Sequence, residues 1–383
     1  MTGIYIHIPF CKTKCPYCDF YSFKGEENQK DSYLEAVLLC LEGYSDRKLK
    51  VDTVYFGGGT PSVFGGERIE RIISYIREGF DLQDNAEITV ECNPSSTDEA
   101  FVRQVKKAGV NRASMGMQSA VDRERKSLGR PSGKEDIKRA VSLFKKEGID
   151  NISLDLMLGV PYQNMESLDE SIDFVLSLGV KHISAYMLKI EKGTPFERDE
   201  KKLPIPDEDT VADMYLHVSQ RLGREGFVHY EISNFALEGF HSRHNTKYWQ
   251  CEDYIGIGPS AHSCYKGKRF YYTRSFDDFI SGKEPVYDGE GEGEEEYIML
   301  ALRLKEGLDG EKFRERYGRA LDKSIFKKAE RYEKRGLLKI EGERIYLTAE
   351  GFLLSNSIIS DLIYGRNTGD GSVCFALTGE IEY

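Results

Sequence analysis

The stretch Ile6-His-Ile-Pro-Phe-Cys11-Lys-Thr-Lys-Cys15-Pro-Tyr-Cys18 ends a short β-rich run and holds three of the eight cysteines of the 383-residue chain. Clustered cysteines in an intracellular chain are more often metal ligands than disulfide partners. A closed zinc site needs four ligands and an iron–sulfur cubane usually takes four thiolates, so three thiolates leave one iron of a cubane open to another ligand. A truncated zinc knuckle and three unrelated core thiols are the alternatives.

Around this stretch, short β-rich runs alternate with amphipathic helical segments. Such alternation is typical of right-handed βαβ units with a parallel sheet. Six repeats suit either an open doubly wound sheet or an incomplete (β/α) barrel. We expect strands at Ile4–Ile8, Thr53–Phe56, Glu87–Glu91, Arg112–Met117, Ile152–Leu156 and His182–Leu188, and helices near 31–43, 66–78, 97–108, 134–147, 166–178 and 207–225.

The second half of the chain changes character. Residues 228–290 are aromatic and indicate a loop-rich segment, and the Gly/Glu alternation at 288–296 indicates a solvated linker. Three helical patterns, a hairpin at 337–348 and a last helix at 349–364 resemble a winged-helix module, for which we expect a packing role. We therefore divide the chain into a barrel core (1–227), the aromatic segment (228–290), a winged-helix-like α+β domain (291–364) and a tail (365–383).

Charge and hydropathy exclude several classes of partner. Lys and Arg total 53 and Asp and Glu total 64, a net charge of −11, and no basic stripe is visible, so we expect no nucleic-acid partner. No apolar run is long enough to span a bilayer, and Met1–Ile8 lacks the basic start and long apolar stretch of a signal peptide. We expect no transmembrane segment and a cytoplasmic protein.

Further polar and glycine residues fall at the ends of the expected strands. Gly57-Gly58-Gly59-Thr60 ends the second strand, and backbone without side chains lets a ligand approach closely, although a flexible turn is the alternative. Glu91, Gln118 and Asp155 end the third, fourth and fifth strands. The carboxyl ends of parallel strands share one face, so these residues predict a shared site there; each could also be an ordinary buried hydrogen-bonding residue.

The cysteine spacing resembles the radical S-adenosylmethionine (SAM) superfamily, whose signature is C-x3-C-x-aromatic-C, with Tyr17 as the aromatic here. The resemblance implies a [4Fe-4S] cluster on Cys11, Cys15 and Cys18. SAM would chelate the open iron through its amino and carboxylate groups and be cleaved to a 5′-deoxyadenosyl radical.

Longer motifs are similar to the oxygen-independent coproporphyrinogen III oxidase (HemN-like) family. They include Tyr5-Ile-His-Ile-Pro-Phe, Glu91-Cys-Asn-Pro, Leu128-Gly-Arg130 and Asp155-Leu-Met-Leu-Gly-Val-Pro161, and the resemblance extends from Tyr5 to about residue 364. It implies an incomplete (β/α)6 barrel, with the number of SAM molecules, one or two, left open. By this resemblance SAM is contacted by Tyr5, Gly58 and Glu91, and the rest of its site is lined by Gly59, Thr60, Gln118, Arg130 and Asp155.

Two departures point to one branch of that family. Phe20 stands where the oxidase has a fourth cysteine, and only ten residues precede Cys11, where the oxidase has a long arm. Both departures fit the HemW branch, whose members are regarded as heme chaperones. The match to the HNxxYW motif at His244–Trp249 fits this branch as well. The resemblance implies heme ligation by His244, since imidazole is a common axial ligand, with His241, His262 and Cys251 as rivals. A hydrogen-bonding core or surface histidine is the alternative.

Three functions remain in competition. The first is a heme-binding protein that passes heme to an unidentified acceptor and takes electrons from an unidentified donor. The second is an oxidase that decarboxylates coproporphyrinogen III, and the third is a radical SAM enzyme acting on an unrelated small molecule. Phe20 and the short N-terminus favour the first over the second, so we expect no coproporphyrinogen oxidase activity, and His244–Trp249 favours the first over the third.

Overall fold

The computed structural model describes residues 1–46 and 48–365, and in them a single curved sheet of twelve strands organises the chain. Six neighbouring strands are parallel and take the order of the sequence. They contain or overlap each of the six expected runs, which confirms the alternating pattern. These strands are β1 (Thr2–Ile8), β2 (Lys50–Gly58), β3 (Asp81–Cys92), β4 (Arg112–Gln118), β5 (Asn151–Leu158) and β6 (His182–Met187).

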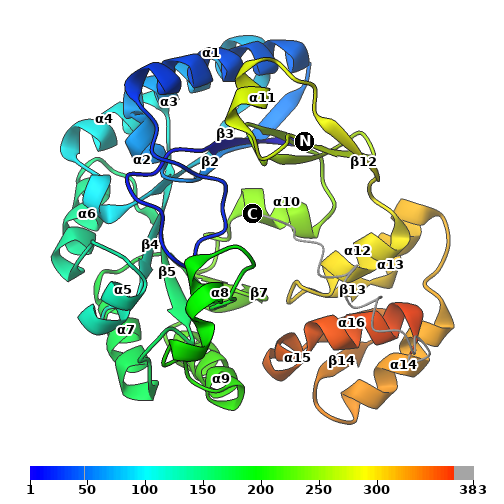
Figure 1. Ribbon diagram of the computed structural model, residues 1–383. Helices are drawn as coiled ribbons and strands as arrows, with labels where there is room; N and C mark the ends of the chain where they lie inside the picture. The colour runs from blue at the N-terminus through cyan, green and yellow to red at the C-terminus, as the bar shows by residue number, and fades with distance from the viewer. Residues whose placement is uncertain (47, 366–383) are drawn as a thin grey trace.

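Helices cover the outer, convex face of the parallel strands (Figure 1). Their apolar stripes pack on the sheet, and side chains at the N-caps, such as Asp98, Asn164 and Asp207, accept backbone N–H bonds that start them. They are α1 (Glu27–Tyr44), α2 (Pro61–Phe64), α3 (Gly66–Gly79), α4 (Glu99–Ala108), α5 (Asp122–Ser127), α6 (Lys134–Lys146), α7 (Met165–Ser177) and α9 (Glu208–Arg224). The short helix α8 (Pro195–Asp199) lies instead beside the loop that follows β1, where the amide of Phe196 donates to Pro16 O at 3.1 Å, and single 3-10 turns occur at Pro94–Ser96 and Glu200–Lys202.

The prediction of a loop-rich segment at 228–290 is wrong, because this region supplies six strands of the sheet. Each has three to five residues, too few for a clear alternating pattern between the turns. They extend the sheet at both ends: β8 pairs antiparallel with β6, and β9 pairs parallel with β1. The elements are β7 (Val228–Glu231), β8 (Asn234–Ala236), α10 (Arg243–Trp249), β9 (Tyr254–Ile257), β10 (His262–Tyr265), β11 (Lys268–Tyr271), α11 (Phe276–Ile280) and β12 (Val286–Glu290).

The sheet therefore stays open, from β12 at one edge to β7 at the other, and β1 does not pair with β6. This is the incomplete (β/α)6 barrel that we expected, with extra strands on both flanks. Among the described residues, no helix is both long and apolar enough to cross a membrane.

The C-terminal domain combines helices with a small antiparallel sheet in the order β13-β15-β14, as the winged-helix-like prediction required. The expected last helix is divided in two at Leu354. The elements are α12 (Glu294–Ala301), β13 (Leu308–Asp309), α13 (Gly310–Tyr317), α14 (Lys323–Glu333), β14 (Leu338–Glu341), β15 (Arg344–Leu347), α15 (Ala349–Leu353) and α16 (Ser355–Tyr364). The predicted tail, from residue 366 on and with Cys374, lies outside the described residues.

This domain is joined to the edge strand β7. The amide of Ile232 donates to Arg303 O at 3.0 Å, and the amide of Lys305 donates to Tyr230 O at 3.0 Å. One hydrophobic cluster extends from the barrel, for example Ile6, into the small sheet at Ile345. The exposed N–H and C=O groups of an edge strand are thereby covered, and the two domains share a core.

Candidate functional site

The loop with the three cysteines leaves the carboxyl end of β1 and is closed by its own backbone. The amide of Cys11 donates to Phe23 O at 2.9 Å, and the amide of Phe23 donates to Pro9 O at 2.9 Å. Within it the amide of Cys18 donates to Cys15 O at 3.1 Å. The loop is thus a defined structure before any ligand is bound.

The three thiols are half-buried and unpaired by disulfides. Burial raises the pKa of Cys18 to about 11, and the charges of Cys15 and Cys11 raise it further, so the three sulfurs influence one another. Across the described chain, no three His, Cys, Asp or Glu side chains are arranged around a point as ligands of a single ion. A cubane places each thiolate on a different iron, so its ligands stand farther apart than those of one ion, and three thiols on one loop are the kind of donors that such a cluster takes.

The glycine loop 57–60 is fastened to the cysteine loop. The amides of Gly59 and Thr60 donate to Ile8 O and Phe10 O at 2.7 and 2.8 Å. A Cβ on Gly59 would lie 2.7 Å from Ile8 O, so this glycine is required by backbone packing. The hydroxyl of Thr60 lies 3.2 Å from Cys11 Sγ. The loop is therefore fixed against the cysteines and is not a flexible turn.

Gly58 has a different reason to be glycine. Its φ is +95°, which side chains rarely tolerate, and a Cβ there would lie 2.6 Å from the His7 ring. His7 is held by Tyr21 O, 2.9 Å from Nε2, and by the hydroxyl of Tyr5, 3.1 Å from Nδ1. Tyr5, predicted to contact SAM, thus reaches the glycine loop through the His7 ring.

Two predicted carboxyls lie half-buried at the same end of the barrel. The hydroxyl of Tyr55 donates to Glu91 Oε1 at 2.7 Å. The pKa of Glu91 is raised to about 7, mainly by burial and in part by the charge of Asp155, and burial raises the pKa of Asp155 to about 6. Ser184 donates to Asp155. Both carboxyls are therefore poised to gain from a cationic or N–H-bearing ligand.

Gln118 and Arg130 form the other wall of the site. Gln118, 1% exposed with φ +68°, accepts the hydroxyl of Tyr186 at 2.9 Å. Arg130 Nε donates to the hydroxyl of Tyr17 at 2.9 Å, and Tyr17 lies between Cys15 and Cys18 in the loop. A Cβ on Gly116 would lie 2.7 to 2.8 Å from both Gln118 Nε2 and Arg130 Nη2, so that glycine makes room for the pair.

These contacts bring the predicted cluster and SAM residues together at the carboxyl ends of β1–β5. Sequence reasoning missed Tyr55, Tyr186 and Arg112, which support them from the barrel interior. Arg112 is 1% exposed, and its Nε and Nη1 have no hydrogen-bond partner among the described residues. A charged residue at the start of an otherwise apolar strand was the signal available for Arg112.

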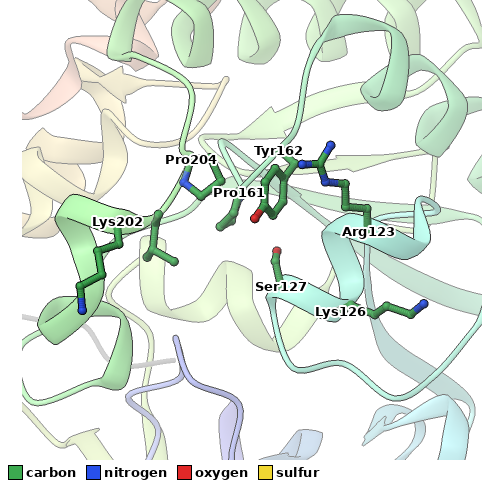
Figure 2. Close-up of a pocket in the computed structure, with 8 residues that line it drawn as sticks. Arg123, Lys126, Ser127, Pro161, Tyr162, Lys202 and Pro204 are labelled. Atoms are coloured by element: carbon green, nitrogen blue, oxygen red, sulfur yellow. The ribbon is translucent and has the colours of Figure 1, made fainter.

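A cavity of about 440 Å³ opens beside this end of the barrel and is drawn in Figure 2. The guanidinium of Arg123 lies 3.7 Å from the centre of the Tyr162 ring, and Ser127 at the rim is three residues before Arg130. None of the predicted site residues lines it; the lining residues are Arg123, Lys126, Ser127, Pro161, Tyr162, Lys202, Leu203 and Pro204.

His244 lies at the opposite, amino-terminal end of the barrel strands, on α10. Figure 1 shows this helix inside the ring of strands. Lys247 Nζ lies 2.9 Å from Asp52 Oδ1 at the start of β2 and donates to Met1 O before β1. Arg243 donates to Asn85 O in β3 at 2.6 Å. The helix that carries the HNxxYW match therefore closes the amino-terminal end of the barrel.

The ring of His244 is 1% exposed, and both of its nitrogens are engaged. Nδ1 lies 2.8 Å from Thr53 Oγ1 and Nε2 lies 2.9 Å from the hydroxyl of Tyr248. The ring stacks on Tyr55 at 5.2 Å, and burial lowers its pKa to about 3. In this arrangement His244 offers no nitrogen to an external ligand, and its assignment to heme stays a prediction.

The other candidate heme ligands, Cys251, His262 and His241, differ from His244 and from one another in their burial and contacts. Cys251 is buried, and burial raises its pKa to about 12. His262 is half-buried and stacks on Tyr271. His241 is exposed and stacks on Tyr230 with ring centres 4.2 Å apart.

Comparison with known proteins identifies the family. The radical SAM superfamily model matches residues 5–175, and the HemN C-terminal domain model matches residues 294–354. The superfamily match implies a [4Fe-4S] cluster and SAM, and it covers the loop with Cys11, Cys15 and Cys18. In overall structure the chain resembles the coproporphyrinogen III oxidase HemN of Escherichia coli, with a TM-score of 0.80 over 94% of this chain and 89% of that one, at 20% identity.

Several curated relatives carry the description "Heme chaperone HemW". The protein of Lactococcus lactis is 33% identical over 94% of this chain and 96% of its own length, and that of Bacillus subtilis is 34% identical over 94% and 98%. The Escherichia coli protein is 38% identical over 68% of this chain and 69% of its own. At this identity and coverage, the chain belongs to the HemW family of radical SAM proteins.

Proposed function

We propose that this protein is a heme chaperone, which binds heme and passes it to an acceptor protein while its barrel holds a [4Fe-4S] cluster and SAM. The observation that carries the proposal is the relationship to curated heme chaperones along nearly the whole chain. The acceptor, the electron donor and a cytoplasmic location belong to the same proposal.

At the carboxyl end of the barrel, Cys11, Cys15 and Cys18 would hold the cluster and leave one iron for SAM. When bound, the cluster supplies the electron that cleaves SAM in radical SAM chemistry. The chain's own part is positional: Thr60 lies against Cys11, Tyr17 fastens the cysteine loop to Arg130, and Glu91 offers a carboxylate beside the glycine loop.

The second candidate is the oxidase, favoured by the likeness in fold to HemN. At 20% identity that likeness supports the fold alone. Phe20, two residues after Cys18, is 42% exposed beside the cysteine loop and supplies no fourth thiolate at that position. A radical SAM enzyme for an unrelated small molecule has no observation in its favour here.

The deciding experiment is anaerobic reconstitution of the protein, with iron, SAM and heme stoichiometries measured in one sample. We expect four irons per chain, bound SAM, and heme in addition. The same preparation is then given coproporphyrinogen III, SAM and a reductant. Sustained formation of protoporphyrinogen would return the protein to the oxidases, and absence of heme binding would reject the chaperone proposal.

A further inference from the structure

A second cavity, of about 390 Å³, lies on the amino-terminal side of the barrel, between β7, α10 and the hairpin β14–β15. This volume is within the range of about 300–1,000 Å³ typical of small-molecule sites. Val228 and Leu304 contribute apolar surface to it, and His241 and Tyr230 contribute rings. It lies where the C-terminal domain meets the edge of the sheet, a common place for a ligand site.

His241 is the histidine of this cavity, and its ring nitrogens form no hydrogen bond with any other described residue. Its ring is parallel to that of Tyr230, with 11° between the planes. Tyr230 is itself fixed, because its hydroxyl lies 2.8 Å from His182 Nε2 and accepts the amide of Ser242 at 3.2 Å. The imidazole is thus oriented by a rigid neighbour while its nitrogens stay available.

The imidazole is also in the protonation state that a metal requires. Partial burial lowers the pKa of His241 from its ordinary value, and the nearby ammonium of Lys305 lowers it as well, whereas Glu306 raises it. The neutral form therefore predominates at neutral pH, and a neutral imidazole is a common axial ligand of heme iron.

Two cations of the cavity have no carboxylate partner among the described residues. These are Lys305, which follows α12, and Arg344, whose Nε donates to the backbone carbonyl of Glu306 at 2.6 Å. The acidic residues of the cavity are engaged elsewhere: Glu306 lies 3.5 Å from Lys312 Nζ, and Glu341 accepts the hydroxyl of Tyr346. Two cations without carboxylate partners next to a partly apolar cavity match a ligand with two carboxylates.

We propose that heme is bound in this cavity, with His241 as its axial ligand and with Lys305 and Arg344 paired to its two propionates. This inference rests on the proposed function and specifies where on the protein heme would bind. The cavity encloses only part of a macrocycle, so an edge of the heme stays accessible to the acceptor. Thr246 of α10 and Gln250, the residue after this helix, line the cavity while His244 packs inward. The HNxxYW helix therefore supports one wall of the heme site without supplying the ligand.

The test of the ligand is hemin titration of the reconstituted protein, followed by absorbance. His241→Ala is compared with the parent and with His262→Ala, a half-buried histidine at the other edge of the sheet. We expect at least a tenfold loss of affinity in His241→Ala, since even the residues that support metal ligands contribute about 10–100-fold. The Soret band should shift in this variant alone, and added imidazole should restore it.

The propionate contacts are tested with the double variant Lys305→Ala/Arg344→Ala, which is titrated with hemin and with hemin dimethyl ester. We expect weaker binding of hemin and unchanged binding of the ester, whose carboxylates are blocked. The matched control is Arg123→Ala/Lys126→Ala, which removes two cations from the cavity of Figure 2. If hemin affinity falls in the control variant and not in Lys305→Ala/Arg344→Ala, heme binds in the cavity of Figure 2 and the inference is overturned.

The outcomes distinguish a wrong heme site from a wrong heme-chaperone function. A parent protein that binds hemin, with His241→Ala binding equally tightly and with the same spectrum, overturns the site and leaves the chaperone proposal standing. A parent protein that binds no hemin overturns both.

Discussion

We expect the predicted contact of Glu91 with SAM to make SAM binding depend on pH. Its pKa of about 7 results mainly from burial, so the carboxyl gains a proton as the pH falls through 7. The ionised form accepts N–H bonds with both oxygens, whereas the protonated form turns one oxygen into a donor. We expect SAM affinity to fall between about pH 7.5 and pH 6. Isothermal titration of the reconstituted protein measures this, and Glu91→Gln should bind SAM more weakly and with a flatter pH profile. An unchanged profile in that variant would assign the pH dependence to another group.

His244 contributes to the stability of the barrel in its neutral form. Its replacement by Ala removes the ring that bonds Thr53 Oγ1 and the Tyr248 hydroxyl, and the loss of a buried hydrogen bond costs about 1 kcal/mol. We expect a lower melting temperature for His244→Ala, while His241→Ala, which removes an exposed ring, should melt close to the parent. Equal melting temperatures for the parent and His244→Ala would contradict the structural role.

The same histidine should sensitise the fold to acid. Burial depresses its pKa from 6.5 to about 3 in the folded protein, so the unfolded chain takes up its proton first. Its contribution to stability is complete above pH 6.5 and is lost as the pH falls from 6.5 towards 3. His244→Gln removes the titrating group, so the difference in unfolding free energy between parent and variant should shrink as the pH is lowered through this window. Chemical denaturation at several pH values measures it.

These side chains show what the sequence could and could not predict. Glu91, Gln118 and Asp155 were predictable together, because the carboxyl ends of parallel strands meet on one face. The surroundings of His244 were not, because a motif of six residues on a seven-residue helix does not tell which side chains face inward. The contact with Thr53 joins residues 191 positions apart, and such long-range pairs are decided by the assembled fold.

In the glycine loop, Gly57 is a better position than Gly58 for a variant that tests SAM binding. Gly58 has φ +95° and touches His7, so any side chain there disturbs the fold as well as the ligand. Gly57 has no positive φ, and its Cβ would lie 2.9 Å from the Tyr55 ring and 3.1 Å from the Glu91 carboxyl. We expect Gly57→Ala to weaken SAM binding with a smaller fall in melting temperature than Gly58→Ala, because only side chains have to shift. SAM affinity and melting temperature, measured for both, check the distinction.

The cysteine loop should lose its cluster when any one of its thiols is removed. Cys11→Ala, Cys15→Ala and Cys18→Ala each leave too few thiolates, so we expect iron and sulfide content near zero after reconstitution. Cys40→Ala is the control, since Cys40 lies on α1 and hydrogen-bonds to Tyr272, away from the loop. A triple variant with the parent's iron and sulfide content would show that the cluster is bound elsewhere.

The elements of the barrel were easier to predict than those that flank it. β1–β6 have six to twelve residues and alternate with long amphipathic helices, which gives a strong periodic signal. β7–β12 have three to five residues, and their place in the sheet depends on partners such as β1 and β6 that lie far away in the sequence. Aromatic composition alone indicated loops there because it carries no information on such pairing.

The proposed sites for SAM and heme lie at opposite ends of one barrel. The predicted SAM residues lie at the carboxyl ends of the strands, and the cavity with His241 lies beyond α10 at the amino ends. With no shared residue and a helix packed between them, we expect SAM affinity to change less than about twofold in the presence of saturating hemin, a coupling of under about 0.4 kcal/mol. Titration of SAM with and without hemin measures the coupling, and competition between the two would place them in one pocket.

The pairing of β1 with β9 sets an order of assembly during synthesis. Gly3 pairs with Tyr254, and its amide donates to Asp253 O, so the first strand to leave the ribosome lacks its second neighbour until most of the chain has been made. At about 5–20 residues per second, that delay lasts at least ten seconds. During this interval the three thiols are attached to a strand with one free edge, exposed to oxidants and to other nascent chains. We therefore expect cluster loading of the newborn protein to be a late event, which depends on the arrival of a segment that contains none of the three predicted cysteine ligands.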